Sequence, residues 1–219
     1  MPQRMKSRPI FAQFYASVAE PGLERAGVSQ FRHRLTEKLT GKVLEIGVGP
    51  GASFPFYPST VTRLVAVEPE ALLRRRAEHA AVTAPINVEV IGGDAEHIAV
   101  EDNSFDAVVT SLVLCSVPDQ SAALTEIARV LKPGGTLRFF EHVRSESARM
   151  WRVQRVLDAT IWPPLNGGCR TGRDTLRALT DASFTLTECE RVRFPDTSFP
   201  FPAAEHVLGT AVMPDRRPS

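Results

Sequence analysis

The sequence predicts an α/β fold: a doubly wound, mostly parallel seven-stranded sheet with helices on both faces and an antiparallel edge strand. Short apolar segments alternate with amphipathic segments of helical periodicity, which is the pattern of βαβ units with right-handed crossovers. A glycine-rich turn follows the first apolar segment. Two further strand-like segments, 185–193 and 206–212, close the chain as a pair, so we expect them to finish the sheet as an antiparallel edge.

Each predicted element has its own signal. Apolar runs predict the other five strands at 43–46, 64–67, 88–91, 105–114 and 136–140. The run from Phe105 to Leu114 is the most apolar, as expected for a central strand covered on both faces. Helical spacing of apolar residues predicts helices at 10–19, 28–39, 71–81 and 122–131. Gly41 ends the second of these helices, and Pro133-Gly134-Gly135 ends the fourth.

The last third of the chain has a weaker pattern. It predicts a helix at 151–160, a loop over 163–173 and a helix at 174–182. For the whole chain we expect one compact domain with an appended cap. Its parts are an N-terminal helical cap at 1–40, a ligand-binding domain at 41–213 and a frayed tail at 214–219.

Length and charge narrow the class of protein. A chain of 219 residues with 43% hydrophobic and 23% charged residues suits one soluble domain. The net charge of +1 provides no general field for nucleic acid or an anionic membrane, so we expect neither as a partner. No run is long and apolar enough to span a bilayer, and the basic N-terminus lacks a signal peptide's apolar segment. We therefore expect a cytoplasmic protein without integral membrane contact.

The three cysteines do not predict a metal centre. Cys115, Cys169 and Cys189 are odd in number and no pair has C-x-x-C spacing, so neither a disulfide framework nor a metal site is expected. We expect them to be small buried hydrophobic side chains. Cys169, which follows Gly167-Gly168, is in addition a candidate for lining a ligand pocket.

The turn Gly47-Val48-Gly49-Pro50-Gly51 predicts a nucleotide-type cofactor. Glycines let the backbone approach a ligand closely, because no Cβ intrudes and positive φ is allowed. Glu68 follows about 20 residues on, where an acid accepts hydrogen bonds from ribose hydroxyls. Gly47, Gly49 and Ala52 also satisfy the G-x-G-x-x-G/A pattern of dinucleotide sites, so this turn alone leaves NAD and S-adenosylmethionine (SAM) both open.

Two further acids favour SAM over NAD. Glu45 lies just before the glycines, where its carboxylate can face the sulfonium and ammonium charges of SAM but would repel the pyrophosphate of NAD. Asp94 follows the third predicted strand in Gly93-Asp94-Ala95-Glu96 and can accept a hydrogen bond from an adenine amino group.

Together these segments resemble class I SAM-dependent methyltransferases, in that family's order and at suitable spacing. The matching segments are Leu44-Glu45-Ile46-Gly47-Val48-Gly49-Pro50-Gly51, Val67-Glu68-Pro69, Gly93-Asp94-Ala95, Phe105-Asp106-Ala107-Val108-Val109 and Leu131-Lys132-Pro133-Gly134-Gly135. The resemblance implies a Rossmann-like methyltransferase fold with SAM as the cofactor. It implies that Gly47, Gly49 and Gly51 wrap the methionine part of SAM, with Glu45 beside them. It further implies that Glu68 and Pro69 hold the ribose, Asp94 and Ala95 frame the adenine, and Ser111 and Leu112 lie beside the methyl donor.

A narrower resemblance points to the methyl acceptor. Four segments resemble the mammalian methyltransferase-like proteins that S-methylate alkyl thiols. They are Gly51-Ala52-Ser53-Phe54-Pro55-Phe56-Tyr57-Pro58, Leu112-Val113-Leu114-Cys115-Ser116-Val117, Glu141-His142-Val143 and Asn166-Gly167-Gly168-Cys169. The chain lacks that group's hydrophobic membrane anchor, so we expect it to be soluble, and its natural acceptor can differ. The first half of the chain also resembles bacterial phospholipid N-methyltransferases. An N-, O- or C-methyltransferase that acts on a lipid amine, a phenol or a quinone therefore remains an alternative. A SAM-binding protein without catalysis is the alternative of another class.

The acceptor side has one leading catalytic candidate. His142 follows the fifth strand, at the carboxyl edge where ligands bind in such sheets, and its ordinary pKa of about 6.5 suits proton acceptance. A purely local, loop-holding role is the other interpretation of His142. Tyr15 in the first helix is a candidate lid over SAM. Candidates for an apolar acceptor pocket are Phe54, Phe56, Tyr57, Trp151, Trp162, Phe199 and Phe201, with the segment 194–202 as its far wall. The oligomeric state has no signal in the sequence.

Overall fold

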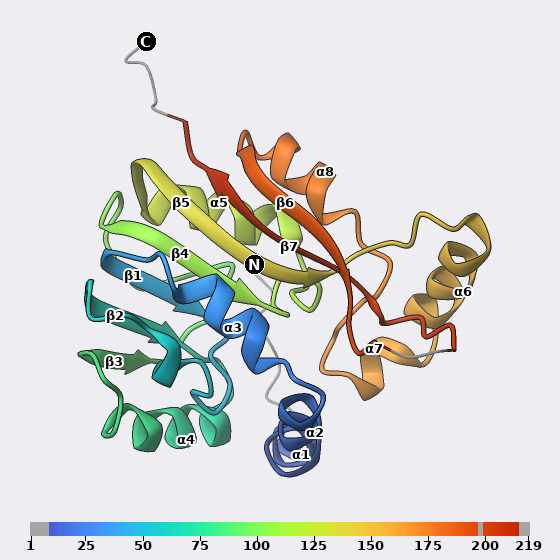
Figure 1. Ribbon diagram of the computed structural model, residues 1–219, viewed down its shortest axis with the longest axis horizontal. Coiled ribbons are helices and arrows are strands. Elements are labelled where there is room, and N and C mark those ends of the chain that lie inside the picture. Colours follow the sequence, from blue (N-terminus) through green and yellow to red (C-terminus); the bar gives the residue numbers. More distant parts are fainter. Residues whose placement is uncertain (1–8, 197–198, 215–219) are drawn as a thin grey trace.

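The computed structural model describes residues 9–196 and 199–214, which build a seven-stranded sheet covered by helices on both faces (Figure 1). The strand order is β3-β2-β1-β4-β5-β7-β6. This confirms the predicted doubly wound, mostly parallel sheet. From β1 the chain adds β2 and β3 on one side, and from β4 onward it adds strands on the other side, so the direction of strand addition reverses between β1 and β4.

The parallel part holds the five strands predicted from apolar runs. They are β1 (Gly41–Ile46), β2 (Val61–Val67), β3 (Val88–Ile91), β4 (Phe105–Ser111) and β5 (Leu131–His142). Adjacent strands in this part pair in parallel, with β1 between β2 and β4. Because helices cover both faces here, the central strands are apolar on both sides, and their buried residues include Val43, Leu44, Val108 and Val109.

The antiparallel edge is confirmed as well. The strand β7 (Glu205–Val212) runs antiparallel to both β5 and β6 (Thr185–Arg193) and lies between them. The outer strand β6 is mostly exposed and carries charged side chains, among them Glu188, Glu190, Arg191 and Arg193. Charges on an edge strand oppose pairing with a further chain.

Two helices on each face build the two halves of the core. On one face α3 (Ser29–Thr36) and α4 (Ala71–Ala81) pack on the sheet, and Phe31 of α3 stacks on Phe140 of β5 with ring centroids 4.6 Å apart. On the other face α5 (Gln120–Val130) and α8 (Thr175–Asp181) bury Leu124, Ile127 and Leu179. Each helix presents one apolar stripe to the sheet, as its sequence periodicity predicts.

The remaining helices lie around the carboxyl ends of the parallel strands. The N-terminal segment is helical through α1 (Pro9–Phe14), the π-helical turn η1 (Tyr15–Ala19) and α2 (Glu20–Arg25), so it extends beyond the predicted end at Ala19. A buried ion pair of 2.7 Å between Glu20 and Arg32 joins α2 to α3. A 3-10 turn, η2 (Phe54–Phe56), follows the glycine turn. The helices α6 (Ala148–Ala159) and α7 (Trp162–Leu165) follow β5.

Three further predicted boundaries were wrong. The strand β4 ends at Ser111 rather than Leu114, because Leu112 has a φ of 61°, which no strand residue adopts. The residues Leu131–Gly135 belong to β5 rather than to a helix end and a turn, because Gly134 and Gly135 exchange backbone hydrogen bonds with Met213 at 3.0 and 2.9 Å. The loop predicted over 163–173 begins inside α7.

No helix among the described residues is long and apolar enough to cross a membrane. The first eight residues of the predicted cap, and 215–219 of the predicted tail, lie outside the described residues.

Candidate active site

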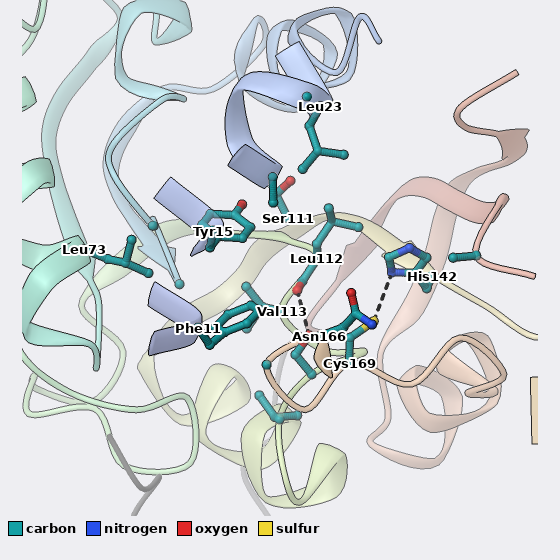
Figure 2. Close-up of a pocket in the computed structure, with 18 of the residues that line it drawn as sticks. Phe11, Tyr15, Leu23, Leu73, Ser111, Leu112, Val113, His142, Asn166 and Cys169 are labelled. Atoms are coloured by element: carbon teal, nitrogen blue, oxygen red, sulfur yellow. Dashed lines mark hydrogen bonds between the residues drawn. The ribbon is translucent and has the colours of Figure 1, made fainter. Parts of the chain in front are cut away.

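A cavity of about 580 Å³ opens at the carboxyl ends of the parallel strands. Ile46 and Gly47 of the β1 end, Glu68 after β2, Ser111 of β4 and His142 of β5 all face it. The connections leave β1 and β4 in opposite directions, so a crevice forms between them, where ligands bind in such sheets. Apolar side chains make up most of the remaining wall: Phe11, Phe14, Leu23, Leu73, Val113, Val117, Trp162, Phe194 and Phe201. Figure 2 labels Phe11, Leu23, Leu73 and Val113 among them.

The glycine turn after β1 brings backbone to the cavity. Gly47 and Gly49 line the cavity with φ of 69° and 57°, in the left-handed region that favours glycine. A Cβ on Gly49 would lie 3.5 Å from Cε1 of Tyr15, which faces the turn from η1. Any side chain at Gly49 would therefore occupy space between the turn and Tyr15.

Glu68 lies where the turn and the end of β2 meet. Its Oε2 accepts a hydrogen bond from the Gly49 N–H at 2.9 Å, and its Oε1 accepts one from the Glu70 N–H at 2.9 Å. A carboxylate has about four acceptor positions, so each oxygen keeps one for a ligand. Burial raises the pKa of Glu68 to about 7, although both backbone hydrogen bonds oppose the shift.

Tyr15, Ser111 and Leu112 also line the cavity (Figure 2). The backbone at Leu112 has a φ of 61°, and its N–H donates to the Phe140 carbonyl at 2.8 Å, so the chain turns sharply at the end of β4. Burial raises the pKa of the Tyr15 hydroxyl, and the charge of Glu20 adds to the shift. Tyr15 is therefore a neutral hydroxyl at physiological pH.

The deep end of the cavity holds a histidine and two cysteines. Nδ1 of His142 lies 3.4 Å from Sγ of Cys115 and 3.5 Å from Sγ of Cys169, and the two sulfurs are 3.8 Å apart. Three separate segments bring them together: the loop after β4, the last residue of β5 and the loop after α7. His142 and Cys169 line the cavity, whereas Cys115 is fully buried behind them.

The three side chains of this cluster shift one another's pKa values. A hydrogen bond with the Cys115 sulfur and the charge and hydrogen bond of the His142 ring together outweigh burial and lower the pKa of Cys169 to about 4. Burial lowers the pKa of His142, but the Cys169 sulfur and the carboxylates of Glu141 and Asp158 outweigh it and raise the pKa above its ordinary value. Burial, followed by Cys169, raises the pKa of Cys115. The arrangement therefore favours a negative sulfur at Cys169 beside a protonated imidazole.

The chain is similar to known methyltransferases. Residues 44–139 match the family described as methyltransferase domain. Over 183 residues, 79% of this chain and 72% of the relative, it is 37% identical to the thiol S-methyltransferase TMT1B of Homo sapiens. It is also 37% identical to the thiol S-methyltransferase TMT1A of Homo sapiens, over 70% of this chain and 64% of that relative, so it spans slightly less than two-thirds of TMT1A. The chain belongs to the class I SAM-dependent methyltransferases.

The fold of this methyltransferase agrees with that of solved relatives. It matches a SAM-dependent methyltransferase of Thermotoga maritima with a TM-score of 0.68 at 22% identity, over 94% of this chain and 98% of that one. As a member of the SAM-dependent methyltransferases, the chain has SAM as its cofactor. The cavity fits SAM, because the glycine turn leaves room for the ligand and Glu68 keeps two acceptor positions for its ribose hydroxyls.

Three predicted SAM contacts do not line the cavity of the methyltransferase. The Oε2 of Glu45 accepts hydrogen bonds from the Ser53 hydroxyl at 2.7 Å and the Tyr57 hydroxyl at 3.0 Å, within the core on the α3 face. Side chains alternate along a strand, so Glu45 points to a helix layer rather than along β1 into the cavity. Glu45, which we expected to face the ligand's positive charge, therefore does not face the cavity in this structure.

Gly51 and Asp94 are the other two. A Cβ on Gly51 would lie 2.7 Å from Cε2 of Phe54, so this glycine serves packing beneath the turn. Asp94 accepts a hydrogen bond from the Glu96 N–H at 3.1 Å and does not line the cavity, whereas its neighbour Ala95 does. The loop after β3 thus presents its alanine, and its aspartate caps the turn.

Some of the aromatic candidates for the acceptor pocket line the cavity, and others do not. Trp162 and Phe201 line the cavity of the methyltransferase with their ring centroids 6.1 Å apart. Phe54 and Tyr57 are buried in the core, and Phe199 is 61% exposed. Phe56 and Trp151 do not line the cavity either. The segment 194–202 contributes Phe194, Pro195 and Phe201 to the wall; residues 197–198 lie outside the described part of the chain.

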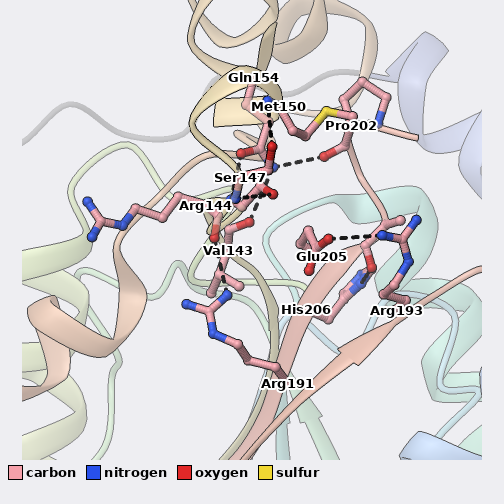
Figure 3. A network of polar contacts seen from close by, with 12 residues as sticks. Val143, Arg144, Ser147, Met150, Gln154, Arg191, Arg193, Pro202, Glu205 and His206 are labelled. Carbon is pink, nitrogen blue, oxygen red and sulfur yellow. Dashed lines mark hydrogen bonds and ion pairs between the residues drawn. The ribbon is translucent and has the colours of Figure 1, made fainter. Parts of the chain in front are cut away.

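A buried glutamine fixes the segments around His142 (Figure 3). The side chain of Gln154 on α6 accepts from the Ser145 N–H at 2.8 Å and donates to the carbonyls of Val143, Thr171 and Pro202 at 3.3, 3.1 and 2.9 Å. These groups belong to the end of β5, the loop that carries Cys169 and the segment before β7. Gln154 therefore joins three walls of the cavity through backbone contacts.

Sequence reasoning missed the cysteine cluster and the Gln154 network. All three cysteines were expected to be buried side chains, with Cys169 also a candidate for the pocket wall. Cys169 does line the cavity, whereas Cys189 is exposed on β6. The signals were present only as isolated residues: Cys115, His142 and Cys169 are each separated from the next by 27 positions. Spacing in the sequence does not predict such a cluster, because the fold alone brings these loops together.

Proposed function

We propose that this methyltransferase transfers the methyl group of SAM to the sulfur of a thiol in an apolar small molecule. The similarity to thiol S-methyltransferases over more than two-thirds of the chain supports sulfur as the acceptor atom. The apolar lining of the cavity supports an apolar body for the acceptor, since few polar groups are available to bind a charged one.

For SAM we propose contacts with the residues that line the strand ends. Gly47 and Gly49 would pack against its methionine part, and Glu68 would accept from the ribose hydroxyls, with Pro69 beside it. Ala95 would contact the adenine, and Ser111 and Leu112 would lie beside the methyl group. The described part of the cap, residues 9–40, would close over the cofactor, with Tyr15 as its contact with the ligand. All these residues line one cavity at one edge of the sheet, and this supports the assignment.

SAM supplies a methyl group on a positively charged sulfonium, which is already a good leaving group. The chain must therefore align the acceptor, exclude water and remove the acceptor's proton. A free thiol with a pKa of about 8.5 is a few per cent ionised at neutral pH, so it needs less help than an alcohol. We propose that His142, at the deep end of the cavity, assists this ionisation.

A panel of matched acceptors tests the proposal. Phenylmethanethiol, benzyl alcohol and benzylamine share one hydrocarbon body and differ in the acceptor atom, so their relative rates isolate the preference for sulfur. Each would be incubated with SAM and the purified chain, and the methylated product and S-adenosylhomocysteine quantified by mass spectrometry. We expect the thiol to be methylated fastest.

Other results of the acceptor panel would favour one of the alternative functions. Faster methylation of the amine or the alcohol would overturn the sulfur proposal and identify an N- or O-methyltransferase. Binding of S-adenosylhomocysteine with no turnover of any thiol, phenol, quinone or lipid amine would favour a non-catalytic SAM-binding protein.

A further inference from the structure

The cluster at the deep end of the cavity has the dimensions of a metal site. Cys115, His142 and Cys169 each offer one ligand atom, and all three atoms lie within 4.8 Å of one another. Zinc bonds of about 2.3 Å to sulfur and about 2.0 Å to nitrogen, at tetrahedral angles, separate two sulfurs by about 3.8 Å and a sulfur from a nitrogen by about 3.5 Å. The corresponding distances in the structure are 3.8 Å, and 3.4 and 3.5 Å.

Two of the three ligand residues face the cavity. Cys169 and His142 line the cavity wall, and Cys115 lies behind them with no exposed surface. An ion bonded to all three would therefore have its fourth tetrahedral position on the cavity side. Three protein ligands and one open position are typical of catalytic zinc sites, whereas structural sites are closed by four.

Charge balance also favours a divalent cation. Two thiolates, a neutral imidazole and one divalent ion sum to zero, so the ion would cancel the charge of its ligands in a buried site. The carboxylate of Glu141 supports the site from behind, since it accepts hydrogen bonds from the backbone N–H groups of Val113 and Cys115, both at 3.1 Å. These bonds hold the Cys115 loop against the end of β5, and such outer contacts orient metal ligands.

We propose that Cys115, His142 and Cys169 bind a zinc ion whose open fourth position takes the acceptor thiol as a thiolate. The acceptor part rests on the proposed function. On binding, the thiol's S–H bond breaks, its proton leaves to solvent, and a zinc–sulfur bond forms with the sulfur lone pair. After methylation the sulfur belongs to a neutral thioether, a weak ligand, so the zinc–sulfur bond breaks and water takes the position.

The chemical type of the three ligand atoms, two sulfurs and one nitrogen, determines which metal ion they prefer. Two thiolates and an imidazole favour zinc over magnesium or calcium, which prefer oxygen. A disulfide between Cys115 and Cys169 is the competing use of the same atoms. It would require the sulfurs to move from 3.8 Å to about 2.05 Å, and it would leave no metal site.

Metal binding can be measured without any activity. The full chain would be purified under reducing conditions, stripped with a chelator and titrated with Co²⁺, whose visible absorption reports tetrahedral thiolate ligation, and then with Zn²⁺ to displace it. We expect one ion per chain for the wild type and for Cys189→Ser, the control on an exposed cysteine. We expect loss of this binding in Cys115→Ser and Cys169→Ser.

Circular dichroism and binding of S-adenosylhomocysteine would establish that each variant is folded. Absence of cobalt absorption in the folded wild type would overturn the inference, as would equal loss in Cys189→Ser. A Cys115–Cys169 disulfide found by mass spectrometry in the reduced, metal-free preparation would overturn it too.

Removal of the ion then tests its role in the reaction. We expect the metal-free chain to methylate a thiol up to about 30-fold more slowly at pH 7, the ratio of a fully ionised thiol to one ionised by a few per cent. Binding of S-adenosylhomocysteine should not change. Equal rates with and without the ion would overturn the inference and leave the proposed function standing. A zinc-bound chain that methylates no thiol would overturn the proposed function and leave the metal site standing.

Discussion

Glu68 and Gly49 are joined by a hydrogen bond of 2.9 Å from the glycine N–H to the glutamate Oε2. The contact links the turn after β1 to the end of β2, two segments that both face the cavity. One residue thus fixes the position of the turn and, in our proposal, accepts the ribose hydroxyls of SAM. The first three predictions concern this pair.

Replacement of Glu68 should weaken SAM binding. Glu68→Ala removes both proposed acceptors for the ribose hydroxyls, and the loss of such contacts costs about 1–3 kcal/mol, or roughly 5- to 150-fold in Kd. Isothermal titration with S-adenosylhomocysteine measures the change. Glu78→Ala, at an exposed position of α4, is the matched control and should bind normally. Unchanged affinity in a folded Glu68→Ala variant would refute the role of Glu68.

Affinity for S-adenosylhomocysteine should depend on pH. Burial raises the pKa of Glu68 in the free protein to about 7, and the ligand's hydroxyls donate to the ionised form. Below about pH 7 the carboxyl must lose a proton on binding, so Kd should rise as pH falls, by up to about tenfold per pH unit. Above about pH 7 the Kd should no longer change with pH. In Glu68→Gln this dependence should be absent; a Kd of the wild type that is constant from pH 5.5 to 8 would contradict the prediction.

Gly49→Val should abolish SAM binding. The φ of 57° at Gly49 strains a branched side chain, and the added atoms would fill the space between the turn and Tyr15, whose Cε1 lies 3.5 Å from the first of them. Thermal unfolding with and without S-adenosylhomocysteine reports both effects: we expect a lower Tm and no shift on addition of ligand. Retained methylation would mean that the glycine serves the turn alone.

His142→Ala should slow thiol methylation at neutral pH by roughly 30-fold or more, because only a few per cent of the free thiol is ionised without assistance. The deficit should shrink above about pH 8.5, where the thiol ionises by itself. Steady-state rates from pH 6 to 10 provide the comparison. His79→Ala, on an exposed position of α4, is the control. A deficit that persists equally at every pH would mean that His142 only holds the loop.

Gln154→Leu should destabilise the fold. The change leaves three buried main-chain groups and one partly buried group without the side chain that bonds them. Each unsatisfied buried group costs about 1–3 kcal/mol, so we expect a loss of about 3 kcal/mol or more in the free energy of unfolding. Urea unfolding measures this loss. Arg152→Leu, on an exposed position of the same helix, should change stability little. An equal effect of the two substitutions would refute the role assigned to the Gln154 network.

Much of the fold followed from local pattern. The helix at 71–81 and the strands at 88–91 and 185–193 have their predicted bounds, since periodicity and turn residues agree there. The errors at Leu112 and at Pro133-Gly134-Gly135 have a tertiary cause. Leu112 turns to meet Phe140, and the two glycines pair with Met213, a residue near the far end of the chain. A local sequence window contains neither partner.

The sequence by itself determined the order of strands and helices, the glycine turn and the presence of Glu68 at the end of β2, because these depend on short-range pattern and spacing. Only the tertiary structure decided which candidates face the cavity. Glu45 and Tyr57 meet in the core, and Gly51 packs on Phe54, because alternation along β1 and the path of the turn direct them inward. Likewise Cys115, His142 and Cys169 meet only because parallel strands end at one edge of the sheet, where loops distant in sequence converge.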